Sequence, residues 1–232
     1  MTQLLLDLKP EQVPSLDNFV AGINAELVDR LRGLADPGCF DMVYVWGSEG
    51  SGRSHLLAAT ALLAAPRRPT TLLAAAQVGA ELHLAPGGLL IIDDVAALSA
   101  AAQVALFRIF NSARLVGLAL LLSGATPPLR LELREDLRTR IGQSLIYEVK
   151  PLSDEEKAAA LRRHALQRGM RIDDGLVQYL LRHGRRDLPT LMAVLDGLDR
   201  ASLQQQRPAT LPLLKEVMQS NWITENDETG SV

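Results

Sequence analysis

The chain has 232 residues, of which 47% are hydrophobic, and its 24 basic and 27 acidic side chains give a net charge of −3 at pH 7. This length suits one large or two small domains with a real core, and the charge excludes a strong overall attraction to nucleic acid or to a membrane. Cys39 is the single cysteine, which excludes an internal disulfide and fits a reducing compartment. Since neither a signal-peptide pattern nor an apolar run of membrane-spanning length is found, the sequence predicts a soluble cytoplasmic protein.

The first 14 residues hold a short apolar run that prolines separate from the rest of the chain. Residues 2–8 read Thr-Gln-Leu-Leu-Leu-Asp-Leu, and Pro10 and Pro14 follow. This pattern is typical of an edge strand or a frayed end. It also suits a linear peptide that inserts alternate side chains into pockets on a partner, namely Gln3, Leu4, Leu6 and Leu8.

Residues 15–46 lead to the first predicted strand. Residues 15–22 form a polar turn that carries an aromatic residue, Phe19, and the spacing of apolar residues predicts a helix over 24–34. The apolar run 42–46 then predicts a strand.

A glycine-rich turn follows that strand and opens the next predicted helix. Residues 47–54 read Gly-Ser-Glu-Gly-Ser-Gly-Arg-Ser, close to the Gly-x-x-x-x-Gly-Lys-Ser/Thr pattern of a phosphate-binding loop. Glycines let the backbone bend round a phosphate with its N–H groups pointing inward, and the helix N-terminus adds partial positive charge. We therefore expect a nucleotide phosphate to be bound by Gly47, Ser48, Glu49, Gly50, Ser51, Gly52, Arg53, Ser54 and His55.

Arg53 stands where the pattern calls for lysine. Its planar guanidinium can bridge phosphate oxygens, but its reach differs from that of an ammonium group and can spoil the alignment that hydrolysis needs. The motif thus predicts nucleotide binding more firmly than turnover. An ordinary glycine turn is the alternative, and the acidic strand further along the chain speaks against it.

A helix over 54–63 and strands over 70–75 and 89–94 are expected next. Residues 89–94 read Leu-Leu-Ile-Ile-Asp-Asp, which is typical of a strand buried on both faces whose acidic end lies at the ligand edge of an open sheet. Asp93, with Ser54, is the predicted Mg²⁺ ligand, and Asp94 would act near the attacking water. A helix N-cap is the competing interpretation of the two acids.

The alternation of helix and strand continues to residue 149. The sequence predicts a helix over 101–114 and a strand over 118–122, which Ser123 follows. Ser123 is placed to sense the γ-phosphate or to position water; a helix or turn cap is the alternative. A mixed-charge helix over 131–140 and a strand over 144–149 complete this part of the chain.

Arg140 ends the predicted helix over 131–140. An arginine at a domain surface commonly just solvates that surface. It can also be an arginine finger, which reaches the nucleotide of a neighbouring subunit and raises the rate of phosphoryl transfer by ~10³–10⁵. The charge pattern leaves both interpretations open.

After residue 150 the sequence turns all helical and predicts a lid over 151–220. Helices are expected over 153–169, 173–181, 187–204 and 211–218. Arg186, at the start of the third of these helices, could reach back to the nucleotide phosphates; solvation of a basic surface cluster is the alternative. Residues 221–232 are polar and acidic and are expected to be disordered.

The order and spacing of these motifs resemble the AAA+ ATPases, in the branch of the bacterial replication initiator DnaA and its shorter relatives of the Hda family. The resemblance lies in six segments: 15–20 (the opening segment), 47–54 (Walker A), 89–94 (Walker B), 123–128 (sensor 1), 137–140 (the Box VII arginine motif) and 186–188 (sensor 2). It covers nearly the whole chain and implies an α/β fold, with an AAA+ parallel sheet flanked by helices over 15–150 and a small all-α lid.

Three features favour the Hda family over the initiator. Only a short acidic tail follows Met218, where the initiator has a helix-turn-helix domain that reads duplex DNA. The segment between Walker A and Walker B is short and mostly apolar, where the initiator has a longer polar segment for single-stranded DNA. Residues 3–8, Gln-Leu-Leu-Leu-Asp-Leu, are similar to the peptide with which Hda proteins bind the DNA polymerase III β sliding clamp.

Three departures from the family patterns stand beside these features. Arg53 is itself typical of Hda-like sequences. Asp7 replaces a proline found in many clamp peptides, which can loosen the extended conformation, and Ala125 replaces an acid often seen near sensor 1, which weakens a role of that stretch in hydrolysis.

The resemblance implies an adaptor in regulatory inactivation of DnaA. It would bind ADP or ATP with Mg²⁺, dock on the DNA-loaded clamp through residues 3–8, and present Arg140 to ATP held by DnaA. DNA would be contacted only through the clamp, and contact between copies of this chain is left open. The alternatives are a DnaA-like or helicase-loader ATPase that acts directly on DNA, which the near-neutral charge disfavours, and a small-molecule P-loop kinase, which the all-helical C-terminal part disfavours.

Overall fold

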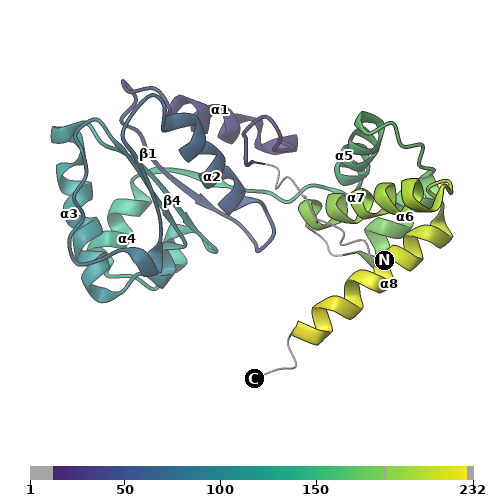
Figure 1. The fold of residues 1–232 in the computed structure, drawn as a ribbon. Helices are drawn as coiled ribbons and strands as arrows, with labels where there is room; N and C mark the ends of the chain where they lie inside the picture. The colour runs from purple at the N-terminus through teal and green to yellow at the C-terminus, as the bar shows by residue number, and fades with distance from the viewer. Residues whose placement is uncertain (1–12, 185–186, 229–232) are drawn as a thin grey trace, which may run out of the picture. The chain divides into compact units, whose positions relative to one another are not determined.

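The computed structural model describes residues 13–184 and 187–228, with side chains as far as residue 219 (Figure 1). The chain divides into two compact units, Met1–Pro151 and Leu152–Val232. We call them the α/β unit and the lid, and each is described by itself.

The α/β unit is built on a five-stranded sheet. Its strands are β1 (Met42–Trp46), β2 (Thr70–Ala74), β3 (Leu89–Asp93), β4 (Ala119–Gly124) and β5 (Leu145–Glu148). They lie in the order β2-β3-β4-β1-β5, and every neighbouring pair is parallel. The expectation of a parallel α/β sheet is confirmed, and all five predicted strands are found. Because all strands point the same way, their carboxyl ends share one edge of the sheet.

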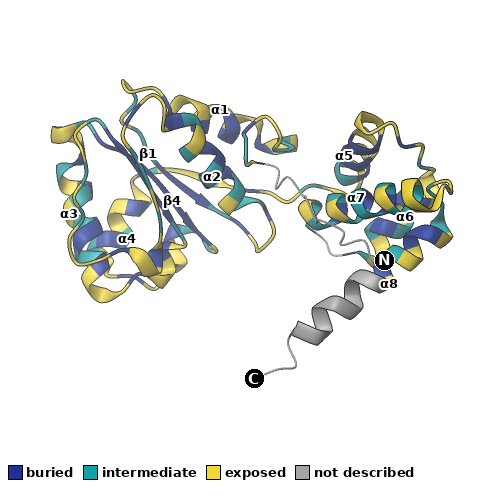
Figure 2. Cartoon of the chain, viewed as in Figure 1, coloured by how far each residue is buried: buried dark blue, intermediate teal, exposed yellow. Residues whose placement is uncertain are grey.

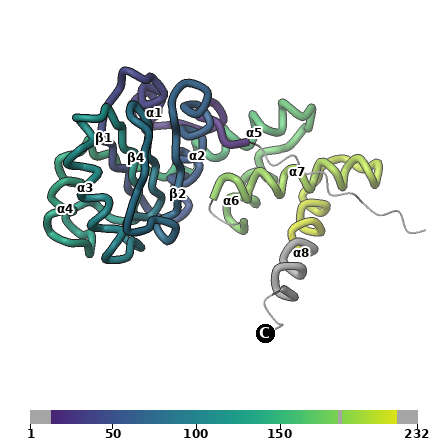
Figure 3. Tube along the Cα trace, turned by 60° about the vertical axis from the view of Figure 1, so that its left-hand side comes forward, coloured from purple at the N-terminus to yellow at the C-terminus, as the bar shows by residue number. Residues whose placement is uncertain are grey.

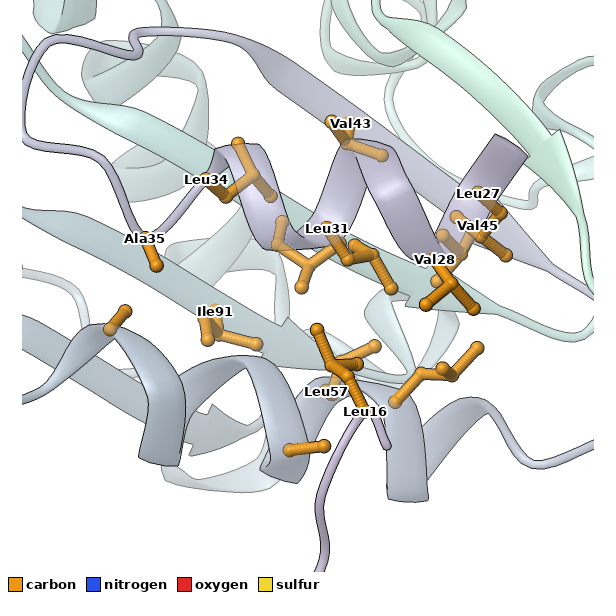
Figure 4. Close-up of a cluster of buried hydrophobic side chains, with 14 of the residues drawn as sticks. Leu16, Leu27, Val28, Leu31, Leu34, Ala35, Val43, Val45, Leu57 and Ile91 are labelled. Atoms are coloured by element: carbon orange, nitrogen blue, oxygen red, sulfur yellow. The ribbon is translucent and has the colours of Figure 1, made fainter. Parts of the chain in front are cut away.

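Helices cover both faces of this sheet (Figure 1). Helices α1 (Ala25–Gly33) and α2 (Arg53–Ala64) pack on one face, whereas α3 (Ala100–Val116) and α4 (Glu135–Gly142) pack on the other. Side chains alternate along a strand, so Val43 and Val45 of β1 face the first pair of helices while Tyr44 faces the second. Figure 4 shows the first of these cores, in which Leu16 from the opening segment joins Leu31 of α1. The central strands are consequently buried on both faces (Figure 2).

Helix α4 begins later than the sequence predicted. The expected helix over 131–140 is observed as Glu135–Gly142; Leu131 has an extended backbone and Leu133 lies in a bend before the helix. Both leucines are buried in the same cluster. Residues two apart face opposite sides of a helix, so a helix that began at Leu131 would not direct both leucines into this cluster.

A buried arginine closes the edge of the sheet where the strands begin. Arg68 is only 4% exposed, and its guanidinium donates hydrogen bonds of 2.8 to 3.1 Å to five main-chain carbonyls, those of Leu34, Asp36, Cys39, Gly87 and Gly88. These carbonyls belong to the segments that lead into β1 and β3. Burial lowers the pKa of Arg68. The hydrogen bonds compensate for the loss of water, because nearly all N–H groups of the guanidinium have an acceptor.

The buried side chain of Asn24 joins the beginning of the α/β unit to its end. The side chain of Asn24, in the short 3₁₀ helix Gly22–Asn24, donates to the carbonyl of Lys150 and accepts from its N–H, both at 2.9 Å. The side-chain amide of Asn24 thus makes the same two hydrogen bonds with Lys150 that a neighbouring strand would make through its main chain.

The lid consists of four helices, α5 (Asp154–Gln167), α6 (Asp174–His183), α7 (Leu188–Gln205) and α8 (Leu211–Glu228), which Figure 3 shows from a second side. Their leucines form a separate core. Side chains cap three of them: Ser153 forms a capping box with Glu156, Asp173 accepts from Leu176 N at 2.7 Å, and Asp187 accepts from Thr190 N at 2.9 Å.

The last helix is longer than predicted. The expected helix over 211–218 continues to Glu228, so residues 221–228 are helical where a disordered tail was expected. The sequence contains neither glycine nor proline between Met218 and Gly230, and nothing in it stops helical hydrogen bonding there. Within the described part of the chain, no helix is both long and apolar enough to cross a membrane.

Candidate functional site

Three neighbouring strands bring the predicted polar residues to one edge of the sheet. Gly47 follows β1, Asp93 ends β3, and Ser123 lies near the end of β4, the strand between the other two. The register pairs Trp46 with Gly124 and Ile92 with Leu122. The loop, the acidic strand end and Ser123 therefore meet at the carboxyl edge, where open α/β sheets bind ligands.

The conformation of the loop over 47–54 requires its glycines. A Cβ atom on Gly47 would lie 2.6 Å from the carbonyl oxygen of Val149 and 2.9 Å from Ser51 Oγ. Gly50 and Gly52 have φ angles of 73° and 95°, which side chains disfavour. Helix α2 begins directly after this turn, at Arg53, so its free N–H groups point at the space that the loop encloses.

Two buried polar atoms of this loop lack a hydrogen-bond partner among the described residues. They are Ser51 Oγ and Arg53 Nη1. Leaving such groups unpaired costs on the order of 1–3 kcal/mol each, and more for a charged group. An anion with several acceptor oxygens would satisfy the guanidinium, the hydroxyl and the helix N-terminus together, so the loop fits a nucleotide phosphate.

Ser123 ties the acidic end of β3 to β4. Its side chain is 0% exposed; its hydroxyl donates to Asp93 Oδ1 and accepts from the N–H of Asp94 at 2.9 Å. The turn-cap alternative for Ser123 does not describe this geometry, because its oxygen accepts from Asp94 N, 29 residues away, rather than from a turn or helix of its own segment.

Asp94 has an unusual backbone conformation. Its φ and ψ angles are 57° and 65°, in the left-handed region that residues other than glycine seldom occupy. Asp94 precedes the 3₁₀ helix Val95–Ala97, but its side chain makes no capping hydrogen bond. The helix-cap interpretation of the two acids is therefore not what the structure shows, and the exposed carboxylate is left at the site.

The opening segment contacts the phosphate-loop side of the unit. A Cβ atom on Gly52 would lie 2.8 Å from a ring carbon of Phe19, and the rings of Phe19 and His55 are 6.0 Å apart. His55 Nε2 lies 3.1 Å from the carbonyl oxygen of Ser15. His55, predicted to bind nucleotide, thus contacts the opening segment from the first turn of α2.

Sequence reasoning missed Tyr44. This residue is fully buried in β1, and its hydroxyl donates to the carbonyl of Thr126 at 2.7 Å, beyond the end of β4. Burial raises its pKa, and Asp94 adds to the increase while Arg53 opposes it. The sequence signal for Tyr44 is a tyrosine between two valines in a buried strand, because a buried hydroxyl needs a hydrogen-bond partner.

Other predicted residues are not brought to this edge. Arg140 is exposed in the last turn of α4, shortly before β5 begins, and therefore lies toward the opposite edge of the sheet. The phosphate loop, in contrast, follows the carboxyl end of β1, which pairs with β5. Arg186 and the peptide residues Gln3, Leu4, Leu6 and Leu8 lie outside the described residues.

The predicted Mg²⁺ ligands are few. Ser54 is exposed in the first turn of α2 and Asp93 is half-buried, and no group of three His, Cys, Asp or Glu side chains suited to a metal occurs in the described ranges. This sparse set fits Mg²⁺, which usually keeps several waters and is bound through one or two protein groups and the phosphates of its nucleotide.

Solved structures of known proteins share this architecture. Domain III of the replication initiation protein DnaA from Thermotoga maritima superposes with a TM-score of 0.71 at 16% identity, covering 90% of this chain and 97% of that one. AMPPCP-bound DnaA from Aquifex aeolicus gives 0.68 at 20%, covering 82% and 65%. A mutant of RuvB from Thermotoga maritima gives 0.69 at 18%, covering 89% and 72%.

These likenesses define the class of protein by its fold: the chain has the AAA+ fold of a parallel P-loop sheet with a helical lid. The sequence of the lid also matches a family model. Residues 154–218 match the family described as "Hda, lid domain", so the helical unit is similar to the lid of that family.

Proposed function

We propose that the protein is a regulator of chromosomal replication initiation that binds an adenine nucleotide and promotes hydrolysis of ATP held by DnaA. The observation that carries the nucleotide part is that two buried atoms of this glycine-shaped loop, Arg53 Nη1 and Ser51 Oγ, have no hydrogen-bond partner among the described residues. The family match of the lid and the DnaA-like fold support the rest.

In this proposal the nucleotide, ADP or ATP, is held by the loop over 47–54, with Ser54 and Asp93 on Mg²⁺. The cation would neutralise phosphate charge. Arg186 would contact the phosphates from the lid. Arg53 favours tight binding over fast turnover by this chain itself, because its fork fits phosphate oxygens but has a different reach from lysine.

Arg140 is the proposed arginine finger for DnaA. Its exposure and its place away from its own loop support action on a second subunit. Arg114 offers a matched control, because it too is exposed in the last turn of a helix, α3, on the same face of the sheet. We expect Arg140→Ala to abolish stimulation of DnaA ATP hydrolysis and Arg114→Ala to retain it.

Residues 3–8 are the proposed ligand of the β sliding clamp, through which DNA is contacted. Burying Leu6 and Leu8 should contribute ~1.5–3 kcal/mol each, so either alanine substitution should weaken clamp binding about tenfold or more. Leu5→Ala changes the side chain between the alternate positions and should weaken binding much less. Equal losses for all three variants would contradict the peptide register.

The test of the whole proposal is ATP hydrolysis by DnaA with DNA-loaded clamp, with and without this protein. Stimulation that is lost on changing residues 3–8 or Arg140 supports the adaptor. Hydrolysis by this chain alone, without stimulation of DnaA, would favour an autonomous ATPase that acts on DNA.

A further inference from the structure

Tyr44 lies beneath the carboxyl edge of the sheet, close enough to Arg53 of the loop over 47–54 and to Asp94 to be affected by their charges. It is 0% exposed, and its ring packs in the core between the sheet and helices α3 and α4. Its hydroxyl donates to Thr126 O at 2.7 Å. Since Thr126 belongs to the turn that follows β4, this hydrogen bond ties the end of β4 to the middle of β1.

The turn after β4 is shaped to admit this hydroxyl. Gly124 has no side chain where the Tyr44 hydroxyl lies, and a Cβ atom there would collide with that oxygen. Gly124 also accepts a 3.4 Å hydrogen bond from Gly47 N. The backbone of residues 124–126 is therefore held from below by Tyr44 and lies beside the start of the phosphate loop.

Ser123 is the residue immediately before this turn. Its only hydroxyl hydrogen is used on Asp93 Oδ1, and its oxygen accepts the N–H of Asp94, whose left-handed conformation needs outside support. A shift of the turn would move Ser123 and with it both acidic residues.

We propose that Tyr44 is a positioning residue of the Mg²⁺-nucleotide site: through the turn 124–126 and Ser123 it fixes Asp93 and Asp94, and it touches neither nucleotide nor metal. This inference rests on the proposed nucleotide site. Burial raises the pKa of Tyr44 above its ordinary value.

The experiment compares two Tyr→Phe variants on adjacent strands. Tyr44→Phe removes the hydroxyl that holds Thr126, and Tyr147→Phe removes one that donates to Glu26 Oε1 at 3.2 Å, on the other face of the sheet. ATP affinity is measured by calorimetry in Mg²⁺ and in EDTA. We expect Tyr44→Phe to weaken Mg²⁺-ATP binding about fivefold, the equivalent of one hydrogen bond, and to change affinity in EDTA less than about twofold. Tyr147→Phe should change neither affinity.

A double-mutant cycle with Ser123→Ala separates positioning from a loss of stability. If Tyr44 acts through Ser123, the two substitutions together should weaken Mg²⁺-ATP binding little more than Ser123→Ala alone. Additive losses, or equal losses in Mg²⁺ and EDTA, would overturn the inference.

Gly124→Ala provides a second variant in case Tyr44→Phe does not fold, as judged by thermal melting. The added methyl group should displace the Tyr44 hydroxyl and produce the same Mg²⁺-selective loss; unchanged Mg²⁺-ATP affinity in a folded Gly124→Ala protein would count against us. Absence of ATP binding by the unaltered chain would overturn the proposed nucleotide site and this inference together. Normal Mg²⁺-ATP binding by Tyr44→Phe would overturn this inference alone.

Discussion

The two edges of the sheet each hold an arginine, in opposite states. At the edge where the strands begin, Arg68 is buried and donates to five main-chain carbonyls. At the carboxyl edge, Arg53 Nη1 and Ser51 Oγ are buried without a hydrogen-bond partner in the described part of the chain. The hydrogen bonds of Arg68 are satisfied within the protein, whereas the phosphate of the proposed nucleotide would satisfy Arg53 and Ser51.

The contrast separates residues that the fold needs from residues that a ligand needs. Satisfied buried groups stabilise the folded chain, whereas an unpaired buried donor and the left-handed backbone of Asp94 each cost stability, which the proposed ligand would offset. Substitutions at the two edges should therefore act on different measured quantities.

The largest expected effect is on stability, at Arg68. Arg68→Met removes the donors of five carbonyls, several of them buried, and should lower the free energy of unfolding by about 3 kcal/mol or more in urea titrations. Arg67→Met alters the exposed neighbour and should change it by no more than about 0.5 kcal/mol. If Arg68→Met lowered the free energy of unfolding by less than about 1 kcal/mol, the proposed difference between the two edges of the sheet would be wrong.

Arg53→Met should affect binding instead. We expect the free energy of unfolding without ligand to change by less than about 1 kcal/mol, because no hydrogen bond of Nη1 is lost. Nucleotide affinity should fall about 10- to 100-fold, as the loss of charge-assisted hydrogen bonds predicts. Urea titration measures the free energy of unfolding, and calorimetry on the same sample measures nucleotide affinity. Destabilisation as large as that of Arg68→Met would contradict this prediction.

Gly52→Ala tests the contact of the loop with the opening segment. A left-handed φ of 95° and a methyl group 2.8 Å from the Phe19 ring should together cost about 1–2 kcal/mol of unfolding free energy. The control is Gly33→Ala at the end of α1, where a Cβ meets nothing within 4 Å. That variant should be neutral or slightly stabilising.

The smallest effect concerns Cys39, whose carbonyl accepts from Arg68 at 2.8 Å. Burial raises the pKa of its thiol. Because the thiolate is the reactive form, alkylation at pH 8 should be several-fold slower in the folded protein than in urea, and the difference should narrow as pH rises through the raised pKa. Equal rates at pH 8 would show that this segment is open.

The carboxyl edge was largely predictable from the sequence, and the opposite edge was not. Buried strands and a phosphate loop leave local patterns, as in the run from Leu89 to Asp93 and the glycines after Trp46. Arg68 leaves none, because its acceptors are carbonyls, which every residue has, from segments distant in sequence. Tyr44 is similar: a tyrosine in a strand suggests a buried hydroxyl, but only the path of the chain after β4 brings its acceptor, Thr126 O, within reach.

The pair formed by Asn24 and Lys150 has a consequence for the order in which the protein folds. The two residues are separated by 126 positions, so during synthesis the buried amide of Asn24 has no partner until nearly the whole α/β unit has emerged. The unit cannot close around a partial chain, because its last strand and this pair arrive together. The lid, whose helices lie next to one another in sequence, follows as a separate unit of mainly local contacts.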